Sequence, residues 1–229
     1  MKENLRRISE DQLFNFINTA LITIGLPQDN AHIVAKLMTQ ADLIGSDAHG
    51  VFRLPQYTKR LLAGGINKTP NIRIERKKNS MAVLNGDNAM GHLVMERAAN
   101  LAVKKAKENG VAWVGANSSN HAGPASLYAR IPLKHNMIGI YVAVGSGNHV
   151  PPWGGTDLLL STNPIAITVP SCNEPPIVLD MATTVAAYGK VKEKLQRNEE
   201  MPVGWMIDGE GKPLTDPKKS SEGYLLPIG

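Results

Sequence analysis

The spacing of apolar residues predicts three helices in the first part of the chain. Apolar side chains recur every three or four positions over residues 13–24 and again over 33–44, which is the period of a helix with one buried face. A shorter third helix is expected over residues 55–62, followed by two glycines that end it. Residues 1–66 are therefore predicted to form a helical N-terminal module.

Capping signals mark the ends of the first two helices. Ser9 followed by Gln12 forms a capping box, and Gly25 ends the first helix because glycine readily adopts the left-handed backbone found at such ends. Asp29 is the expected N-cap of the second helix, and Gly45 is its expected end.

After Pro70 the pattern changes to alternating strands and helices. The expected strands are residues 72–76, 81–85, 111–116, 138–144, 165–169 and 177–180. The expected helices are residues 90–109, 124–136 and 185–197, with Thr183 or Thr184 as the cap of the last. The last three strands alternate little between apolar and polar residues, which predicts a sheet covered on both faces. Residues 67–229 are therefore predicted to form an α/β domain.

Composition and charge narrow the possible functions. The chain of 229 residues has a net charge of +5, but its lysines and arginines are dispersed among acids, and only 5% of residues are aromatic. A platform for stacking bases is poorly supplied, so nucleic-acid binding is not expected. The single cysteine, Cys172, excludes an internal disulfide framework and an all-cysteine zinc site.

The sequence carries no sign of a targeting or membrane segment. The charged start of the chain runs directly into the first helix, unlike a signal peptide. The stretch 136–156 lacks charged residues, but its glycines and the pair Pro151-Pro152 interrupt any membrane helix. We therefore expect a cytoplasmic protein without a membrane span.

Two glycines after the strand at 138–144 resemble the start of a dinucleotide-binding fingerprint. The segment Gly145-Ser146-Gly147 lacks the third glycine, and Pro151-Pro152 follow where a helix would have to begin. The context of a Rossmann site is therefore absent, and the same glycines also suit a tight turn.

The six histidines fall into two groups by position. The first group lies in expected helices among charged residues, which favours surface or half-buried structural roles: His32, His92 and His135. The second group lies in loops rich in glycine, serine and asparagine: His49, His121 and His149. Loop histidines are acid/base candidates, because an imidazole exchanges a proton near neutral pH. A metal site made of three histidines is conceivable, but no pair has metal-ligand spacing on one helix, so none is expected.

Two further sites of interest lie at the ends of expected elements. Arg53 and Tyr57 share a helical face, where the guanidinium can hold a carboxylate, although an ion pair of Arg53 with Asp47 is the structural alternative. Asp180 ends an apolar strand, where its carboxylate can accept hydrogen bonds from ribose hydroxyls or cap the next helix.

Several motifs, taken in order, resemble those of one family. Residues 46–57 (SDAHGVFRLPQY) resemble the S-H-G-V-x-R-x-x-x-Y segment of the malate/L-lactate dehydrogenase family, with Ala48 where the family often has serine. Residues 120–123 resemble its N-H-x-G loop. Further blocks follow in the family's order: residues 152–155, 162–164, 180–183, 189–190, 202–205 and 215–217. The resemblance covers nearly the whole chain, and an ordered series of motifs is more specific than any one of them.

The resemblance implies an NAD(P)-dependent oxidoreductase that interconverts small 2-hydroxy and 2-keto acids, or related imines. It also implies a homodimer and a non-Rossmann, mixed-sheet NAD(P)-binding domain beside the helical module. By carry-over, His121 and His49 are the acid/base residues, since different members give that role to one or the other. The implied substrate residues are Ser46, Arg53 and Tyr57, and the implied residues for NAD or NADP are Ser146, Asp180, Met181, Ala182 and Thr183.

The family continues beyond position 229 with a Gly-rich, Lys-containing cofactor segment. We therefore expect these residues to be the front portion of a longer oxidoreductase. The alternative hypothesis is a truncated, catalytically silent remnant that at most binds nucleotide or a full-length partner.

Overall fold

The chain divides into two compact units in the computed structural model, which describes residues 7–145 and 147–228. Unit 1 comprises Met1–His135 and unit 2 comprises Asn136–Gly229. The predicted boundary at 66/67 does not coincide with this division, because residues on both sides of it share one core. Ile72 and Leu93, for example, pack in the same buried cluster as Leu21.

The N-terminal helices of unit 1 form as the apolar spacing predicts. They are α1 (Glu10–Thr23), α2 (Gln28–Leu43) and α3 (Leu54–Leu62), with two 3₁₀ turns, Asp47–His49 and Val51–Arg53, between α2 and α3. The capping box is present: the Gln12 backbone N–H donates to Ser9 Oγ at 3.2 Å, and the Ser9 N–H donates to Gln12 Oε1 at 3.1 Å. The prediction for Asp29 is wrong, because α2 begins after Pro27 and places Asp29 inside its first turn.

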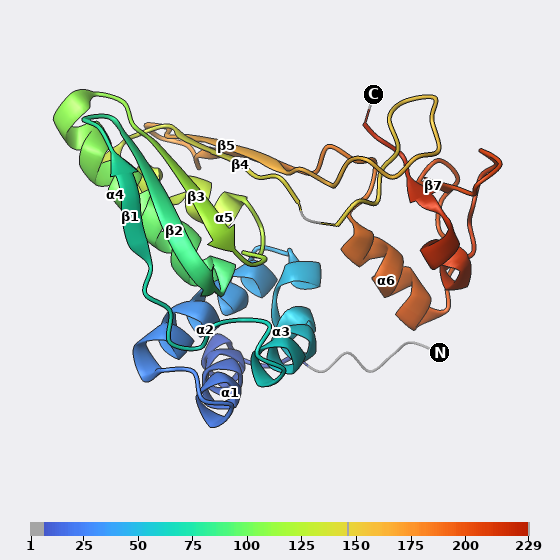
Figure 1. The fold of residues 1–229 in the computed structure, drawn as a ribbon, viewed down its shortest axis with the longest axis horizontal. Helices are drawn as coiled ribbons and strands as arrows, with labels where there is room; N and C mark the ends of the chain where they lie inside the picture. The colour runs from blue at the N-terminus through green and yellow to red at the C-terminus, as the bar shows by residue number, and fades with distance from the viewer. Residues whose placement is uncertain (1–6, 146, 229) are drawn as a thin grey trace. The chain divides into compact units, whose positions relative to one another are not determined.

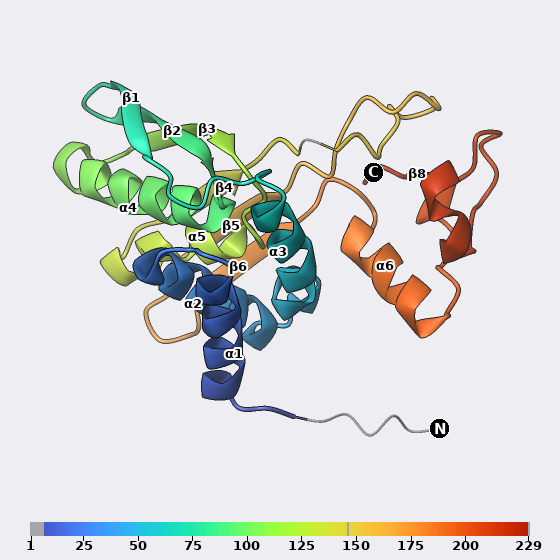
Figure 2. The same ribbon diagram turned by 60° about the horizontal axis from the view of Figure 1, so that its bottom comes forward.

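A mixed sheet of three strands completes unit 1. Strand β1 (Arg73–Lys77) pairs antiparallel with β2 (Met81–Ala89), and β2 pairs parallel with β3 (Trp113–Ser119). The crossover between the two parallel strands is helix α4 (Gly91–Asn109), which lies along the sheet in Figures 1 and 2. The parallel pairing brings the carboxyl ends of β2 and β3 together at one end of the sheet, beside the start of α4.

The helix predicted over residues 124–136 is interrupted. It forms only α5 (Ser126–Ala129), and a 3₁₀ turn, Ile131–His135, follows. Pro132 explains the break, because proline donates no backbone hydrogen bond and disfavours the α conformation at the preceding residue.

Unit 2 contains an antiparallel sheet of β4 (Gly139–Val142), β5 (Ile165–Val169) and β6 (Ile177–Met181). One face is closed, since Ala166 and Thr168 have no exposed surface. The prediction of a sheet covered on both faces is wrong for the described residues, because Ile140 and Leu179 on the other face are 57% and 42% exposed. Antiparallel sheets, unlike parallel ones, commonly leave one face open.

The rest of unit 2 is a small cluster around helix α6 (Tyr188–Arg197) and the short strands β7 (Met206–Ile207) and β8 (Tyr224–Leu225). Its core is formed by Val150, Val191, Met201, Met206 and Leu225. Neither Thr183 nor Thr184 caps α6, whose N-cap is Ala187; the two hydroxyls donate instead to the backbone oxygens of Thr162 and Ala186. Within the described ranges, no helix is long and apolar enough to cross a membrane.

Candidate active site

The segment that carries His49 is held against α2 by a carboxylate. The Val51 backbone N–H donates to Asp42 Oδ2 at 2.8 Å. A side chain at Gly50 would place its Cβ within 2.2 Å of the Asp42 carboxyl, so only glycine permits this close approach. Burial raises the pKa of Asp42 and Asp47 raises it further, while the Val51 hydrogen bond opposes both. Asp42 therefore fixes the path of the chain from His49 into α3.

The loop that carries His121 is fixed from the other side. Asn120 Nδ2 donates to the backbone oxygens of Asn88 and Ala89 at 3.0 and 2.9 Å, and to Asn88 Oδ1 at 2.8 Å. The first residue of α4, Gly91, lies so close that a Cβ there would come within 2.1 Å of the Asn120 backbone oxygen. The end of β2 and the start of α4 thus set the position of His121.

These two segments bring four of the predicted residues together. Tyr57 Oη lies 2.6 Å from His121 Nδ1, a hydrogen-bond distance. The rings of His49 and His121 stack with centroids 5.5 Å apart at an interplanar angle of 14°. Arg53 precedes Tyr57 by one helical turn. Residues far apart in the sequence therefore form one histidine–tyrosine cluster within unit 1.

The surroundings keep both hydrogen-bonded partners neutral. Burial is the main cause that raises the pKa of Tyr57 well above its usual range, and Arg53 and Arg60 only partly oppose it. His121 is exposed by its solvent-accessible surface, although Tyr57 and His49 lie directly against its ring. Desolvation first, and then the charges of His49 and Arg53, hold the pKa of His121 well below its ordinary value. At neutral pH the pair is therefore an imidazole and a phenol.

His92 is a fully buried member of the cluster, so the expectation of a surface or half-buried position is wrong. It has no exposed surface, and neither of its ring nitrogens has a hydrogen-bond partner among the described residues. Its ring meets that of Tyr57 edge-to-face, with centroids 5.5 Å apart at 83°. Burial, assisted by His49, lowers the pKa of His92 to about 3. The neighbouring Leu93 and Val94 belong to the core, and this apolar context was the available signal.

Arg53 uses only part of its guanidinium on protein atoms. Its Nε donates to the Ala48 backbone oxygen at 3.0 Å and its Nη1 to Gln56 Oε1 at 2.8 Å. No ion pair with Asp47 forms in the part of the chain that the structure describes. Ser46 is half-buried, and its backbone oxygen accepts the His49 N–H at 2.8 Å. Both residues therefore lie beside the segment that leads into the cluster.

The predicted cofactor residues lie in unit 2, at the end of β6. Asp180 is exposed, whereas Met181, Ala182 and Thr183 are half-buried. Asp180 adds to the effect of burial that raises the pKa of Tyr141 to about 12. Ser146 lies outside the described residues. The described residues 147–160 contain no helix, and Val150 pairs with Leu160, as the failed fingerprint implies.

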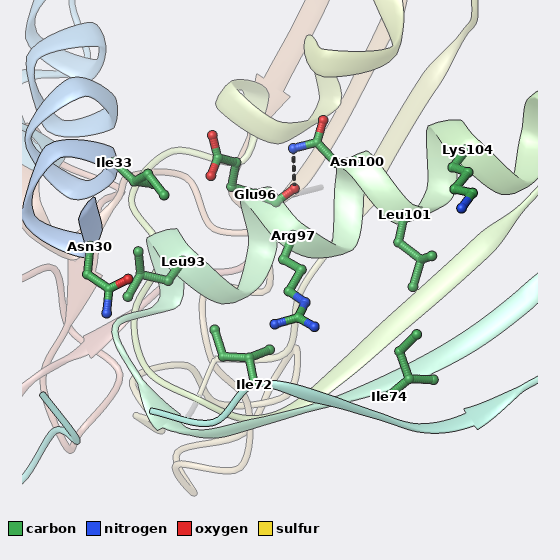
Figure 3. A pocket seen from close by; sticks show the side chains of 10 residues that line it. All are labelled: Asn30, Ile33, Ile72, Ile74, Leu93, Glu96, Arg97, Asn100, Leu101 and Lys104. Carbon is green, nitrogen blue, oxygen red and sulfur yellow. Dashed lines mark hydrogen bonds between the residues drawn. The ribbon is translucent and has the colours of Figure 1, made fainter. Parts of the chain in front are cut away.

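A cavity of about 590 Å³ lies elsewhere in unit 1, between α2, β1 and α4 (Figure 3). Its lining is mostly apolar, with Ile33, Ile74 and Leu93 around the side chain of Arg97. It contains none of the predicted site residues. No group of three metal-ligating side chains occurs among the residues described here.

Comparisons with known proteins agree with this architecture. The profile of the malate/L-lactate dehydrogenase family matches residues 8–229. The chain is 40% identical over 228 residues to the malate dehydrogenase of Pyrococcus horikoshii, covering 99% of this chain and 63% of that protein. It is 40% identical to the L-sulfolactate dehydrogenase of Methanothermobacter thermautotrophicus, covering 97% and 65%. The solved malate dehydrogenase of Entamoeba histolytica superposes with a TM-score of 0.94 at 30% identity, covering 98% of this chain and 64% of that one.

The fold and these likenesses place the chain among proteins with the α/β architecture expected from the sequence. The chain belongs to the malate/L-lactate dehydrogenase family, as its motifs indicated. It spans less than two thirds of the length of these relatives.

Proposed function

We propose that this protein is an NAD(P)-dependent oxidoreductase that interconverts a small 2-hydroxy acid and its 2-keto acid. The observation that carries the proposal is the 2.6 Å contact between Tyr57 Oη and His121 Nδ1, with His49 stacked on the same imidazole. Malate and sulfolactate, after which the two relatives are named, are both 2-hydroxy acids.

His121 is the proposed acid/base residue. Its Nδ1 faces Tyr57, so Nε2 is the nitrogen left for the substrate. In the oxidation direction the ring takes its Nδ1–H tautomer, in which Nδ1–H donates to Tyr57 Oη and Nε2 accepts the proton of the substrate hydroxyl. The Gly123 N–H, 3.3 Å from His121 Nδ1, donates to that nitrogen only in the Nε2–H tautomer. In the reduction direction the same Nε2–H returns its proton to the carbonyl oxygen. A ring that is neutral at pH 7 suits the first of these roles.

Arg53 is the proposed partner of the substrate carboxylate. Its Nε and Nη1 are held by Ala48 and Gln56, and this fixes the plane of the guanidinium. A charge-assisted hydrogen bond from the remaining edge orients the carbon that carries the hydroxyl relative to His121. Tyr57 and Ser46 line the same substrate-binding region in this proposal, and His49 supports the His121 ring.

Asp180, Met181, Ala182 and Thr183 are the proposed cofactor residues. A bound nicotinamide cofactor supplies or accepts the hydride. These residues fit a nucleotide, because the exposed Asp180 carboxylate near the end of β6 can accept hydrogen bonds from ribose hydroxyls. We further propose that the cofactor is NAD or NADP, that the protein forms a homodimer, and that it is cytoplasmic.

Turnover of reduced nucleotide tests the proposal directly. We expect absorbance at 340 nm to fall when the protein is mixed with NADH or NADPH and a 2-keto acid such as oxaloacetate or pyruvate. A flat trace with both nucleotides and a panel of keto acids contradicts it. Thermal unfolding with added nucleotide then identifies the alternative, since saturable stabilisation without turnover indicates a protein that only binds; ligand at 100 times its dissociation constant adds about 2.7 kcal/mol.

A further inference from the structure

Arg53, at the N-cap of α3, and Arg60, within α3, lie on either side of Tyr57 along the helix. Arg53, Tyr57 and Arg60 follow at intervals of four and three residues, so their side chains lie on the same side of the helix. Seven helical residues correspond to a separation of about 10 Å along the axis, a span that two long guanidinium side chains can close from both ends. Nothing in the local sequence pattern around Arg60 indicates a role for it.

Arg60 is tied to the loop of His121 through Asn120. Its Nη2 donates to Asn120 Oδ1 at 2.9 Å. The orientation of the Asn120 amide is determined, because its Nδ2 donates to the backbone oxygens of Asn88 and Ala89. Among the described residues this is the one hydrogen bond of the Arg60 side chain, so Nε and Nη1 remain for a ligand. Arg60 is therefore held beside His121 while two of its guanidinium nitrogens can still donate to a ligand.

The charges around the Tyr57–His121 pair are all of one sign. Arg53 and Arg60 act on both residues, and the other ionisable groups that act on His121, which are His49 and His92, are bases. No carboxylate is among them. The single carboxylate of a substrate such as pyruvate compensates one arginine and leaves the other without a counter-charge. Two negative groups on one small substrate compensate both.

We propose that Arg60 determines specificity by binding a second acidic group of the substrate, while Arg53 binds the carboxylate next to the reacting carbon. The preferred substrate is then a dianionic 2-hydroxy acid whose second group is a carboxylate or a sulfonate. This inference rests on the proposed function, because it places the reacting carbon between Arg53 and His121. Arg60 contacts the end of the substrate away from the reacting carbon, so it affects the choice of substrate rather than the proton transfer.

The test compares a dianion with a monoanion in variants of one helix. The variants are Arg60→Gln, Arg60→Lys as the conservative replacement, and Lys59→Gln as a control that removes the same charge from an exposed neighbour. The measured quantities are kcat/KM for oxaloacetate and for pyruvate, and the dissociation constants of L-malate and L-lactate from NMR titrations of the histidine ring nitrogens. The binding arm needs no turnover.

We expect Arg60→Gln to lower kcat/KM for oxaloacetate and the affinity for L-malate on the order of 10–100-fold, the range for a lost hydrogen bond to a charged group. Values for pyruvate and L-lactate should change less than about threefold, Arg60→Lys should recover part of the loss, and Lys59→Gln should resemble the wild type. An equal loss for both substrates, or none for either, overturns the inference and leaves the proposed function standing. Arg60-dependent binding of L-malate without turnover of any keto acid contradicts the proposed function instead, and absence of both binding and turnover contradicts both.

Discussion

The buried imidazole of His92 predicts that the protein loses stability steeply on mild acidification. In the folded chain the pKa of His92 is lowered from 6.5 to about 3, mainly because burial disfavours the charged ring. The unfolded chain therefore binds a proton between these values that the folded chain does not. Stability must then rise with pH across this window and fall as the pH drops through 6.5.

The size of the effect follows from the window. Each pH unit inside it changes the free energy of unfolding by about 1.4 kcal/mol, so His92 removes about 2 kcal/mol between pH 7 and pH 5. That is a large share of the roughly 5–15 kcal/mol that stabilises a typical domain. His121 has a lowered pKa as well and adds to the slope of the wild type. The contribution of His92 is therefore obtained by comparing the wild type with a variant that lacks this histidine.

Urea denaturation at pH 5, 6, 7 and 8, followed by the circular dichroism of the helices, most of which lie in unit 1, measures this difference. His92→Leu keeps a similar volume but cannot be protonated, so relative to the wild type it should gain about 2 kcal/mol between pH 7 and pH 5. His135→Gln, an exposed histidine of the same unit, is the control and should keep the wild-type slope. Parallel curves for the wild type and His92→Leu would refute the reasoning, because they would mean that the folded protein protonates His92 readily.

Three further predictions concern the contacts that build the site and the first helix. Tyr57→Phe removes the hydrogen bond to His121 Nδ1 but keeps the ring, and should lower kcat/KM for 2-hydroxy-acid oxidation about tenfold at 340 nm; an unchanged value would exclude a role for the phenol. Gly91→Ala pushes a Cβ against the Asn120 backbone oxygen and should cost about 1–3 kcal/mol in chemical denaturation, whereas Gly115→Ala, which meets nothing within 4 Å, should be close to neutral. Ser9→Ala breaks the capping box of α1 and should cost about 1 kcal/mol, and a thermal melt identical to the wild type would contradict this.

The sequence predicted those features that depend on local spacing. The ends of α1 and α4 follow from the capping box and from Gly110, whose φ of 80° is typical of a helix end. The motif around His49 and the loop of His121 were found as separate segments. Their meeting depends on the parallel pairing of β2 and β3, and a pairing between distant strands leaves no local trace in the sequence.

The predictions that failed each depend on tertiary context. His92 was expected at the surface or half-buried because charged residues lie close in sequence, but the start of α4 turns it inward beneath Tyr57. Arg60 was overlooked, since only the folded chain brings Asn120 to its side. The apolar strands of unit 2 were expected to be covered on both faces, yet their antiparallel order leaves Ile140 and Leu179 exposed in the residues described. Local patterns therefore located the reactive groups but not the partners that hold them.

The proton-transfer role of His121 is the central claim, and it is tested most directly by comparing His121→Gln with His49→Gln in the oxidation of L-malate. The account predicts that His121→Gln lowers kcat/KM on the order of 10²–10⁴-fold, the usual contribution of a positioned acid/base residue. His49→Gln should lower it much less, and the wild-type rate should stay level as the pH falls towards 6, because the pKa of His121 is lowered well below its ordinary value. If His121→Gln retained activity within about threefold of the wild type while His49→Gln lost it, the proton transfer would belong to His49 and the account would be contradicted.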